Sequence, residues 1–563
     1  MNKTFNHYMK AAGLALAALA AGACSDTWDD HYNGGNGVPG SDISLWQTIA
    51  SNDQLSNFAR VLDSCGYKPS LDGSQVFTVF APVNAGFTEA QADSVIALYQ
   101  EEKQSGVITK DNKAIKEFVQ NHIALYNYSV ATEAQDTTIV MMNGKYLGFG
   151  STQFDGRSLE LKNRLTKNGV LFTIANPASY TPNIFEYLKR DATLDSLSTF
   201  LYSYNIYEFD PDQSVAGEIV DGQTTYLDSV KVLKNELLST YVGEINDEDS
   251  VFSMVVPNNS EWDRLLTQYT PYFNYNSTVE KRDSMQNYYS HMFISNGTVF
   301  SMTSNTEQSL QDSAVSVNAR SQSLREQIYG FKGAKYYMYD DPKPFEPGGV
   351  FYGAEKVACS NGTVYKVPQW NLHPTQTFMR KIYVEAENSN YRKEYSEDAS
   401  RVPNIVTVSS DNEQYYNKVS QNKYIEFLSK TSNSRPSVTY YVPNVLSNVP
   451  YDIKLVMVPA LAGDTAATDD NRKKVKVNVE LGWQDETGKE ITEEKLSSQE
   501  CKKDMVDTLL VAENFMFPTC TYGIDPQVTL KISAARVRST EKEEFQTSLR
   551  IDCIILEPKE TRQ

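Results

Sequence analysis

The stretch VFTVFAPVNAGF, residues Val76–Phe87, decides the fold because it recurs 175 residues further along as VFSMVVPNNSEW, residues Val251–Trp262. In the first copy, apolar residues alternate along the chain up to Pro82, a pattern that predicts a β-strand ended by the proline. Self-similarity of this kind indicates an internal repeat. The sequence on either side of the two copies is therefore expected to repeat as well.

Two further blocks repeat in the same order. LWQTIASNDQLSNFARVL, which begins at Leu45, is similar to IFEYLKRDATLDSLSTFL, which begins at Ile184, with an offset of 139 residues. Asn168-Gly169-Val170 is similar to Asn361-Gly362-Thr363 with an offset of 193 residues. The apolar spacing of the first block predicts two helices. The unequal offsets indicate insertions, chiefly between residues 205 and 249, in the second copy of an α+β unit.

The repeated blocks resemble a known family. The strand-Pro-x-Asn-x-x-aromatic pattern resembles the first signature of the fasciclin domain, and NHIALYNYSV around His122 and NYYSHMFISN around His291 resemble its second, histidine-bearing box. KNGVLFTI and SNGTVYKV resemble its closing strand. The resemblance implies two α+β fasciclin-like domains, residues 42–180 and 181–375, that serve as spacer and adhesion units.

The repeated polar residues are better explained by structure than by chemistry. His122 and His291 occupy matching positions beside apolar residues, and neither has a ligand spacing such as His-x-x-x-His around it. We therefore expect core histidines with hydrogen-bonded ring nitrogens. Asn84 and Asn259 follow the prolines and suit a turn or a helix N-cap.

The last third of the chain, residues 376–563, is predicted to be an all-β sandwich because short runs of period two recur along it. Its opening KIYVEAEN and closing SLRIDCIILEP resemble a galactose-binding-like sandwich of the carbohydrate-binding-module type. We expect no cofactor, with one exception that the resemblance implies: in that family the first-strand acids, here Glu385 or Glu387, can hold a structural calcium. The alternative is that both face solvent from an edge strand. The predicted fold class is thus tandem α+β fasciclin-like domains followed by an all-β sandwich.

Four aromatic residues of this module are candidates for stacking on sugar rings. They are Trp483, Tyr415, Tyr416 and Tyr522, which we expect in loops. The alternative is that they are half-buried strand residues, since the chain contains 35 tyrosines.

The N-terminal sequence predicts where the protein is located. Lys3 and Lys10 precede an apolar, small-residue stretch, so residues 1–23 read as a signal peptide. The sequence before Cys24 resembles a bacterial lipobox, which implies that Cys24 is lipidated and anchors the protein in the outer membrane; an ordinary secretory signal is the alternative. Residues 24–41 form an acidic, Gly-rich tether.

Three acidic residues of this tether also bear on the predicted location. They are Asp26, Asp29 and Asp30. They resemble the export signal of Bacteroides-type surface lipoproteins, which implies that the protein faces the cell exterior. A solvated linker with a periplasmic location is the alternative.

The composition and the absence of enzyme motifs argue against two classes of function, nucleic-acid binding and catalysis. The net charge of −19 argues against nucleic-acid binding, which needs clustered Lys and Arg. The sequence contains no G-x-S-x-G elbow, Walker A loop, H-E-x-x-H helix or Cys-x-x-Cys pair, so we predict no enzyme. A pair of carboxylates keeps a glycoside hydrolase as a remote alternative. The five cysteines after Cys24 allow at most two disulfides, of which Cys501–Cys520 is favoured.

Short Asp-Ser or Asp-Thr motifs resemble the O-glycosylation motif of Bacteroides-type exported proteins. The candidate acceptors are Ser94, Thr137, Ser196, Ser229, Ser284, Ser313, Thr465 and Thr508. Taken together, the sequence favours a non-catalytic surface lipoprotein that binds a glycan or partner protein, as an accessory component of a SusC/SusD-type nutrient-uptake complex. The alternative is an adhesin or structural assembly subunit that binds protein through its fasciclin-like domains.

Overall fold

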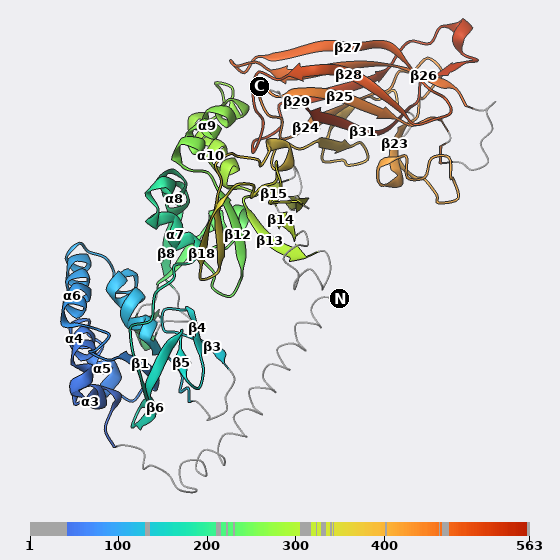
Figure 1. The fold of residues 1–563 in the computed structure, drawn as a ribbon. Helices are drawn as coiled ribbons and strands as arrows, with labels where there is room; N and C mark the ends of the chain where they lie inside the picture. The colour runs from blue at the N-terminus through green and yellow to red at the C-terminus, as the bar shows by residue number, and fades with distance from the viewer. Residues whose placement is uncertain are drawn as a thin grey trace. The chain divides into compact units, whose positions relative to one another are not determined.

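The computed structural model describes residues 42–129, 136–209, 215–220, 223–228, 231–304, 317–321, 324–327, 334–337, 340–341, 343–399, 402–460, 462–463 and 472–559 (Figure 1). The chain divides into two compact units, Met1–Pro182 and Asn183–Gln563. No helix in these described ranges is long and apolar enough to cross a membrane. The order of elements is α+β, α+β and then all-β, as the sequence predicts.

The first unit packs helices against one sheet. Its main helices are α3 (Leu45–Ala50), α4 (Ser56–Ser64), α5 (Lys68–Asp72) and α6 (Glu89–Gln104). Its strands are β1 (Phe77–Pro82), β2 (Ile123–Ala124), β3 (Thr137–Val140), β4 (Tyr146–Phe149), β5 (Gln153–Phe154), β6 (Arg157–Thr166) and β7 (Gly169–Ile174). The strand order is β2-β1-β7-β6-β5-β4-β3, so the first long strand lies beside the last.

Strand β1 is buried on both faces. It runs parallel to β7, with Phe77 opposite Gly169, and all six of its residues are buried. Phe77 and Val79 join the core beneath the helices, whereas Phe80 joins a second core on the other face with Phe154. The strand therefore reads as a nearly continuous apolar run, as is typical of a parallel strand covered on both sides.

The second unit begins with the same arrangement. Its helices are α7 (Ile184–Arg190), α8 (Asp195–Tyr202), α9 (Asn259–Tyr269) and α10 (Arg282–Ser295). Its sheet runs β17 (Asp340–Asp341), β14 (Val317–Ser321), β13 (Val299–Ser304), β12 (Phe252–Val256), β19 (Gly362–Lys366) and β18 (Glu355–Cys359). Strand β12 runs parallel to β19 with Phe252 opposite Gly362, the same pairing that Phe77 and Gly169 make.

Additional hairpins distinguish this second repeat. Between α8 and α9 the chain forms β8 (Asn205–Phe209), β9 (Val215–Val220), β10 (Gln223–Asp228) and β11 (Lys231–Asn235), paired as β8–β11 and β9–β10. A further hairpin consists of β15 (Leu324–Gln327) and β16 (Ala334–Tyr337). The first set occupies the segment in which the repeat offsets predict an insertion.

Equivalent asparagines fasten the two repeats internally. Asn168 Oδ1 accepts a hydrogen bond from the backbone N–H of Leu45 at 2.8 Å, and Asn361 Oδ1 accepts one from Ile184 at 2.9 Å. The Asn361 side-chain amide also donates to the carbonyls of Ile245 and Asp247, at 2.9 and 2.8 Å. Each asparagine thus ties the closing strand to the first helix of its own repeat.

The asparagines of the first signature do not cap their own helices. Asn84 Oδ1 accepts from the backbone N–H of Asn57 in α4 at 3.1 Å, and Asn259 Oδ1 accepts from that of Ser196 in α8 at 3.0 Å. The N-cap of α9 is instead Asn258. The expected capping chemistry is present, but it acts on a neighbouring helix of the same repeat.

The sandwich consists of two sheets, antiparallel except for the short parallel pair of β26 (Lys474–Gln484) and β30 (Phe545–Gln546). One contains β22 (Asn404–Thr407), β23 (Lys423–Phe427), β31 (Leu549–Pro558), β25 (Pro450–Met457) and β28 (Asp507–Met516), with β20 (Ile382–Glu385) also paired to β31. The other contains β21 (Arg392–Tyr395), β24 (Ser437–Val442), β29 (Val528–Ala534), β26 and β27 (Glu490–Cys501), with β30 paired to β26. The predicted period-two runs coincide with β25, β26, β29 and β31.

The second repeat and the sandwich share one hydrophobic core, which includes Phe273 and Phe293 of the repeat together with Tyr451 and Cys520 of the sandwich. Polar contacts also cross this junction. The Asn276 side-chain amide donates to Gln484 at 3.1 Å and to Gln527 at 2.7 Å. The repeat and the sandwich therefore form one unit.

Candidate functional site

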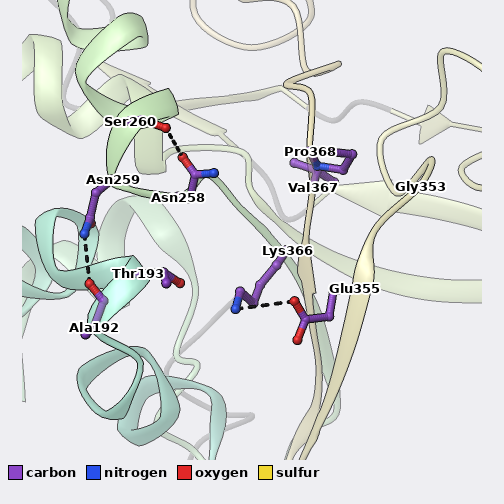
Figure 2. A pocket seen from close by; sticks show the side chains of 10 residues that line it. All are labelled: Ala192, Thr193, Asn258, Asn259, Ser260, Gly353, Glu355, Lys366, Val367 and Pro368. Carbon is purple, nitrogen blue, oxygen red and sulfur yellow. Dashed lines mark hydrogen bonds and ion pairs between the residues drawn. The ribbon is translucent and has the colours of Figure 1, made fainter.

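A pocket of about 630 Å³ lies within the second repeat. Figure 2 shows its lining: Ala192, Thr193, Asn258, Asn259, Ser260, Gly353, Glu355, Lys366, Val367 and Pro368. One wall is the start of α9 and the turn before α8, and the opposite wall is formed by the chain around Gly353 and after strand β19. Small-molecule sites commonly have volumes of roughly 300–1,000 Å³, so this pocket has the size of a ligand site.

A group of charged side chains lies at the base of the pocket. Lys366 Nζ is 2.8 Å from Asp191 Oδ2 and 3.5 Å from Glu355 Oε2, and the Tyr187 hydroxyl donates to Asp191 at 2.7 Å. Burial alone would raise the pKa of Asp191, but hydrogen bonds from Lys366, Thr193 and Tyr187 hold it well below its ordinary value. The Asp191 carboxylate in turn raises the pKa of Lys366. Both groups are ionised at neutral pH.

The helix wall supplies polar groups to the pocket. Asn258 Oδ1 accepts from the backbone N–H of Glu261 at 2.9 Å and from the Ser260 hydroxyl at 2.8 Å. In the part of the chain that the structure describes, the Asn258 Nδ2 group has no hydrogen-bond partner. The cap is therefore satisfied through its oxygen, and its two N–H donors remain available.

A second cluster, of carboxylates, lies in the sandwich where β20 pairs with β31. The Ser420 backbone N–H donates to both oxygens of Asp552 at 3.1 Å, and the Ser420 hydroxyl donates to Glu385 at 2.7 Å. Ligand atoms of Glu385, Asp552 and Cys553 lie within 4.8 Å of one another. Glu385 and Glu387 each have one buried carboxylate oxygen without a hydrogen bond, so the alternative that both face solvent from an edge strand is wrong.

This cluster carries more negative charge than its surroundings balance. Burial, together with the neighbouring carboxylates, raises the pKa of Asp552 to about 7 and that of Glu387 to about 7. Carboxylate oxygens are the ligands that Ca²⁺ prefers. Glu385 and Asp552 therefore fit a hard divalent cation, to which the sulfur of Cys553 would contribute little, whereas Glu387 is a charged neighbour outside the group of close ligand atoms.

Two of the four candidate sugar-binding aromatics are buried. Trp483 lies in strand β26 rather than in a loop, and its ring is 5.1 Å from that of Phe515. Tyr415 is 1% exposed, and its hydroxyl donates to the Asp504 carbonyl at 2.9 Å while accepting from Arg472 at 2.8 Å. The expectation that both rings are exposed in loops is wrong because each fills space in the sandwich.

The other two aromatics differ from each other. Tyr522 is half-buried at the junction with the second repeat, and its ring lies 5.1 Å from Tyr289 and 5.3 Å from Phe293. Tyr416 is 37% exposed. The four rings therefore do not gather on one surface.

The two histidines at matching repeat positions differ in their burial and hydrogen bonding. His122 is fully buried, its Nδ1 donates to the Phe118 carbonyl at 2.7 Å, and its Nε2 accepts from the Ala178 backbone at 2.9 Å. These bonds satisfy only the neutral ring, and burial lowers the pKa of His122 to about 4. His291 is half-buried and contacts Phe200 and Trp262, with its Nδ1 bonded to the Asn287 carbonyl at 2.6 Å.

The candidate glycosylation acceptors are in varied settings. Ser94, Thr137, Ser284 and Thr508 are exposed, whereas Ser196 is half-buried. Ser229, Ser313 and Thr465 lie outside the described residues, as do Cys24, Asp26, Asp29 and Asp30.

The five described cysteines are all free, so the favoured Cys501–Cys520 disulfide is wrong; Cys520 instead lies in the shared core.

Sequence reasoning missed two sets of residues. Asp552 is a carboxylate inside the apolar strand LRIDCIIL, and an acid in such a run is a signal of a buried polar site. Asp191, Glu355 and Lys366 left no comparable signal. Glu355 and Lys366 meet as cross-strand partners of β18 and β19, and Asp191 reaches Lys366 from the end of α7, far away in the sequence.

Solved structures similar to this chain include two-domain and multi-module proteins. A FAS1 domain pair from the insect cell adhesion molecule Fasciclin I is 12% identical, with a TM-score of 0.18, and the match covers 59% of this chain and 97% of that chain. A Clostridium thermocellum xylanase with CBM22-1 and GH10 modules, complexed with xylohexaose, is 13% identical, with a TM-score of 0.19, and the match covers 30% of this chain and 29% of that chain.

A Paenibacillus xanthan lyase is 6% identical, with a TM-score of 0.20, and the match covers 43% of this chain and 19% of that chain. The chain thus spans less than a third of the length of each of these two enzymes. No curated protein matches the chain.

The family model of the Fasciclin domain matches residues 53–178. This segment contains helix α4, the turn at Asn84 and the closing strand β7. The chain therefore contains, at residues 53–178, a segment that matches the Fasciclin domain.

Proposed function

We propose that this protein is a non-catalytic lipoprotein of the bacterial cell surface that binds an extracellular glycan or partner protein, as an accessory component of a SusC/SusD-type nutrient-uptake complex. The observation that carries the proposal is the fasciclin domain at residues 53–178, because such domains are associated with adhesion and binding. The lipobox-like sequence before Cys24 and the acids Asp26, Asp29 and Asp30 support a lipid anchor and an outward orientation.

Each part of the chain has a task in this proposal. The lipid on Cys24 anchors the protein in the outer membrane, and the Gly-rich tether up to residue 41 gives it reach. The two repeats act as spacer and binding units. A structural calcium held by Glu385 and Asp552 would fasten β20, β31 and the Ser420 loop of the sandwich. The buried Glu385 oxygen that has no hydrogen-bond partner among the described residues supports this site.

The experiment that tests the proposal is a pull-down from outer membranes with the full, tagged chain as bait, read by mass spectrometry and paired with a glycan array. A Cys24→Ala variant is the control, because it removes the lipid and leaves the described residues unchanged. Recovery of a SusC/SusD-type pair with the wild-type bait supports the accessory role. A bait that returns alone, together with a blank array, contradicts it.

A protein-binding adhesin is the second candidate, and a surface on the first repeat favours it. Tyr126 is 66% exposed and Leu125 is 44% exposed, side by side in the chain. The Thr78 hydroxyl donates to the Tyr126 carbonyl at 2.6 Å and accepts from the Tyr128 N–H at 2.8 Å, so the backbone that presents them is fixed. Loss of cell or protein adhesion in Tyr126→Ser, with adhesion retained in the equally polar change Tyr146→Ser, would favour this candidate.

A further inference from the structure

We propose that the pocket of the second repeat binds a neutral, hydroxyl-rich ligand, namely the end or a branch of an extracellular glycan. This inference rests on the glycan-binding arm of the proposed function and places that activity in the second repeat instead of on the sandwich. The side chains that carry it are Asn258, Ser260, Glu355 and Lys366, with Pro368 on the opposite wall (Figure 2).

The charges of the pocket compensate one another. Lys366 is shared between Asp191 at 2.8 Å and Glu355 at 3.5 Å, so its charge is already balanced. One net negative charge remains, and the N-terminus of α9, which lines the same pocket, carries roughly half a positive charge. The site therefore has no strong preference for an anion or a cation, and it suits a neutral ligand that hydrogen-bonds.

The hydrogen-bonding groups match hydroxyls. A hydroxyl both donates and accepts, and this pocket offers both functions. Asn258 Nδ2 and Lys366 Nζ are donors, whereas the Glu355 side chain, 68% exposed, is an acceptor. A ligand with several hydroxyl groups can satisfy all three at once, which a purely apolar or singly charged molecule cannot.

The opposite wall offers an apolar surface for the C–H face of a sugar ring. It is formed by Val367 and Pro368, beside Gly353. Gly353 has a φ of +69°, and a Cβ at this position would lie 3.4 Å from the Pro368 ring. Glycine therefore leaves this wall free of a side chain where the ligand would lie.

The first repeat shows that the fold does not require the charged residues Asp191, Glu355 and Lys366. At the position of Lys366 it has Thr173, which pairs with Leu161 where the second repeat pairs Lys366 with Glu355. The counterpart of Asp191 is Asn52, and both cap the following turn in the same way. The same framework forms with neutral residues, so the charges of the second repeat serve the pocket.

The test uses the full chain in detergent and an array of neutral and acidic oligosaccharides, followed by calorimetric titration of each hit. Ser260→Trp fills the pocket mouth from an exposed position at the start of α9, and Glu355→Gln removes the charged acceptor while keeping its shape. The control is Thr267→Trp, an exposed position of the same helix that does not line the pocket. Circular dichroism confirms that the variants are folded.

We expect wild type and Thr267→Trp to bind the same neutral oligosaccharide, Ser260→Trp to lose it, and Glu355→Gln to bind about tenfold more weakly, the effect of one hydrogen bond to a charged group. A hit that survives both Ser260→Trp and Glu355→Gln overturns the pocket but leaves the proposed glycan function intact. Binding confined to acidic glycans also overturns the inference. A blank array overturns it too, while a captured membrane partner would still uphold the protein-binding arm of the proposed function.

Discussion

Acidification should selectively destabilise the first unit through His122. Its fully buried ring is hydrogen-bonded on both nitrogens as the neutral form, and protonation would place a second N–H against that of Ala178. Burial lowers the pKa of His122 from 6.5 to about 4. The unfolded chain therefore takes up a proton at higher pH than the folded one, and stability is lost as the pH falls from 6.5 to about 4.

The size of this loss follows from the shift. Each pKa unit corresponds to about 1.4 kcal/mol, so the free energy of unfolding of the first unit should fall by about 3 kcal/mol across that interval. His122→Gln can accept from Ala178 and donate to Phe118 without titrating. It should be less stable at pH 7, because the ring contacts with Phe58 and Phe118 are lost, and its stability should not share this fall.

The assay is urea denaturation at several pH values, followed by pulse modification of Cys65 and mass spectrometry. Cys65 lies in the core of the first unit, so its modification reports that unit alone. His291→Gln in the second unit is the matched control and should leave the Cys65 profile unchanged. The reasoning is refuted if wild type keeps its stability between pH 6.5 and 4.5, or if His122→Gln shows the same slope as wild type.

Three other changes have expected outcomes. Asn361→Ala removes three hydrogen bonds and should destabilise the second unit by about 2–4 kcal/mol in urea, more than Asn371→Ala, which removes one; equal effects would contradict the fastening role. Calcium at 100 times its Kd should stabilise wild type by about 2.7 kcal/mol in thermal melts and leave Asp552→Asn unchanged; a response retained by the variant would place the ion elsewhere. The intact mass should exceed that of the lipidated polypeptide, and peptide mapping should place glycan on exposed acceptors; a mass equal to the lipidated polypeptide would exclude O-glycosylation. The acceptors to map are Ser94, Thr137, Ser284 and Thr508.

The repeat was predictable from sequence because its residues serve the same backbone in both copies. The offsets of 139, 175 and 193 residues relate helices and strands of the two copies. They also relate individual hydrogen bonds: the bond between Asn168 and Leu45 in the first copy corresponds to that between Asn361 and Ile184 in the second. The strands of the sandwich were predictable for a similar reason, because a face buried against the other sheet imposes a period of two.

The candidate sites were less predictable because they depend on which strands become neighbours. Glu385 was a candidate from its own strand, whereas Asp552 joins it only because β20 pairs with β31. Trp483 looked like a loop residue because WQDETG resembles a turn, yet β26 continues through Gln484 and the ring packs on Phe515. The spacing of residues in the sequence predicts local secondary structure well, but it does not predict which distant strands pair.

The position of β31 has a consequence for how the second unit completes its fold. This strand lies between β23 and β25 in its sheet and also pairs with β20, although it follows every other described strand in the chain, at residues Leu549–Pro558. Because translation runs from the N-terminus, the second unit cannot complete its sandwich until these residues have been made. A product shortened before residue 549 would leave three strands, β20, β23 and β25, without this partner and open to proteases and to other chains. Closure of this sheet therefore reports that translation has reached β31, because only polypeptides that include this strand can join β20, β23 and β25.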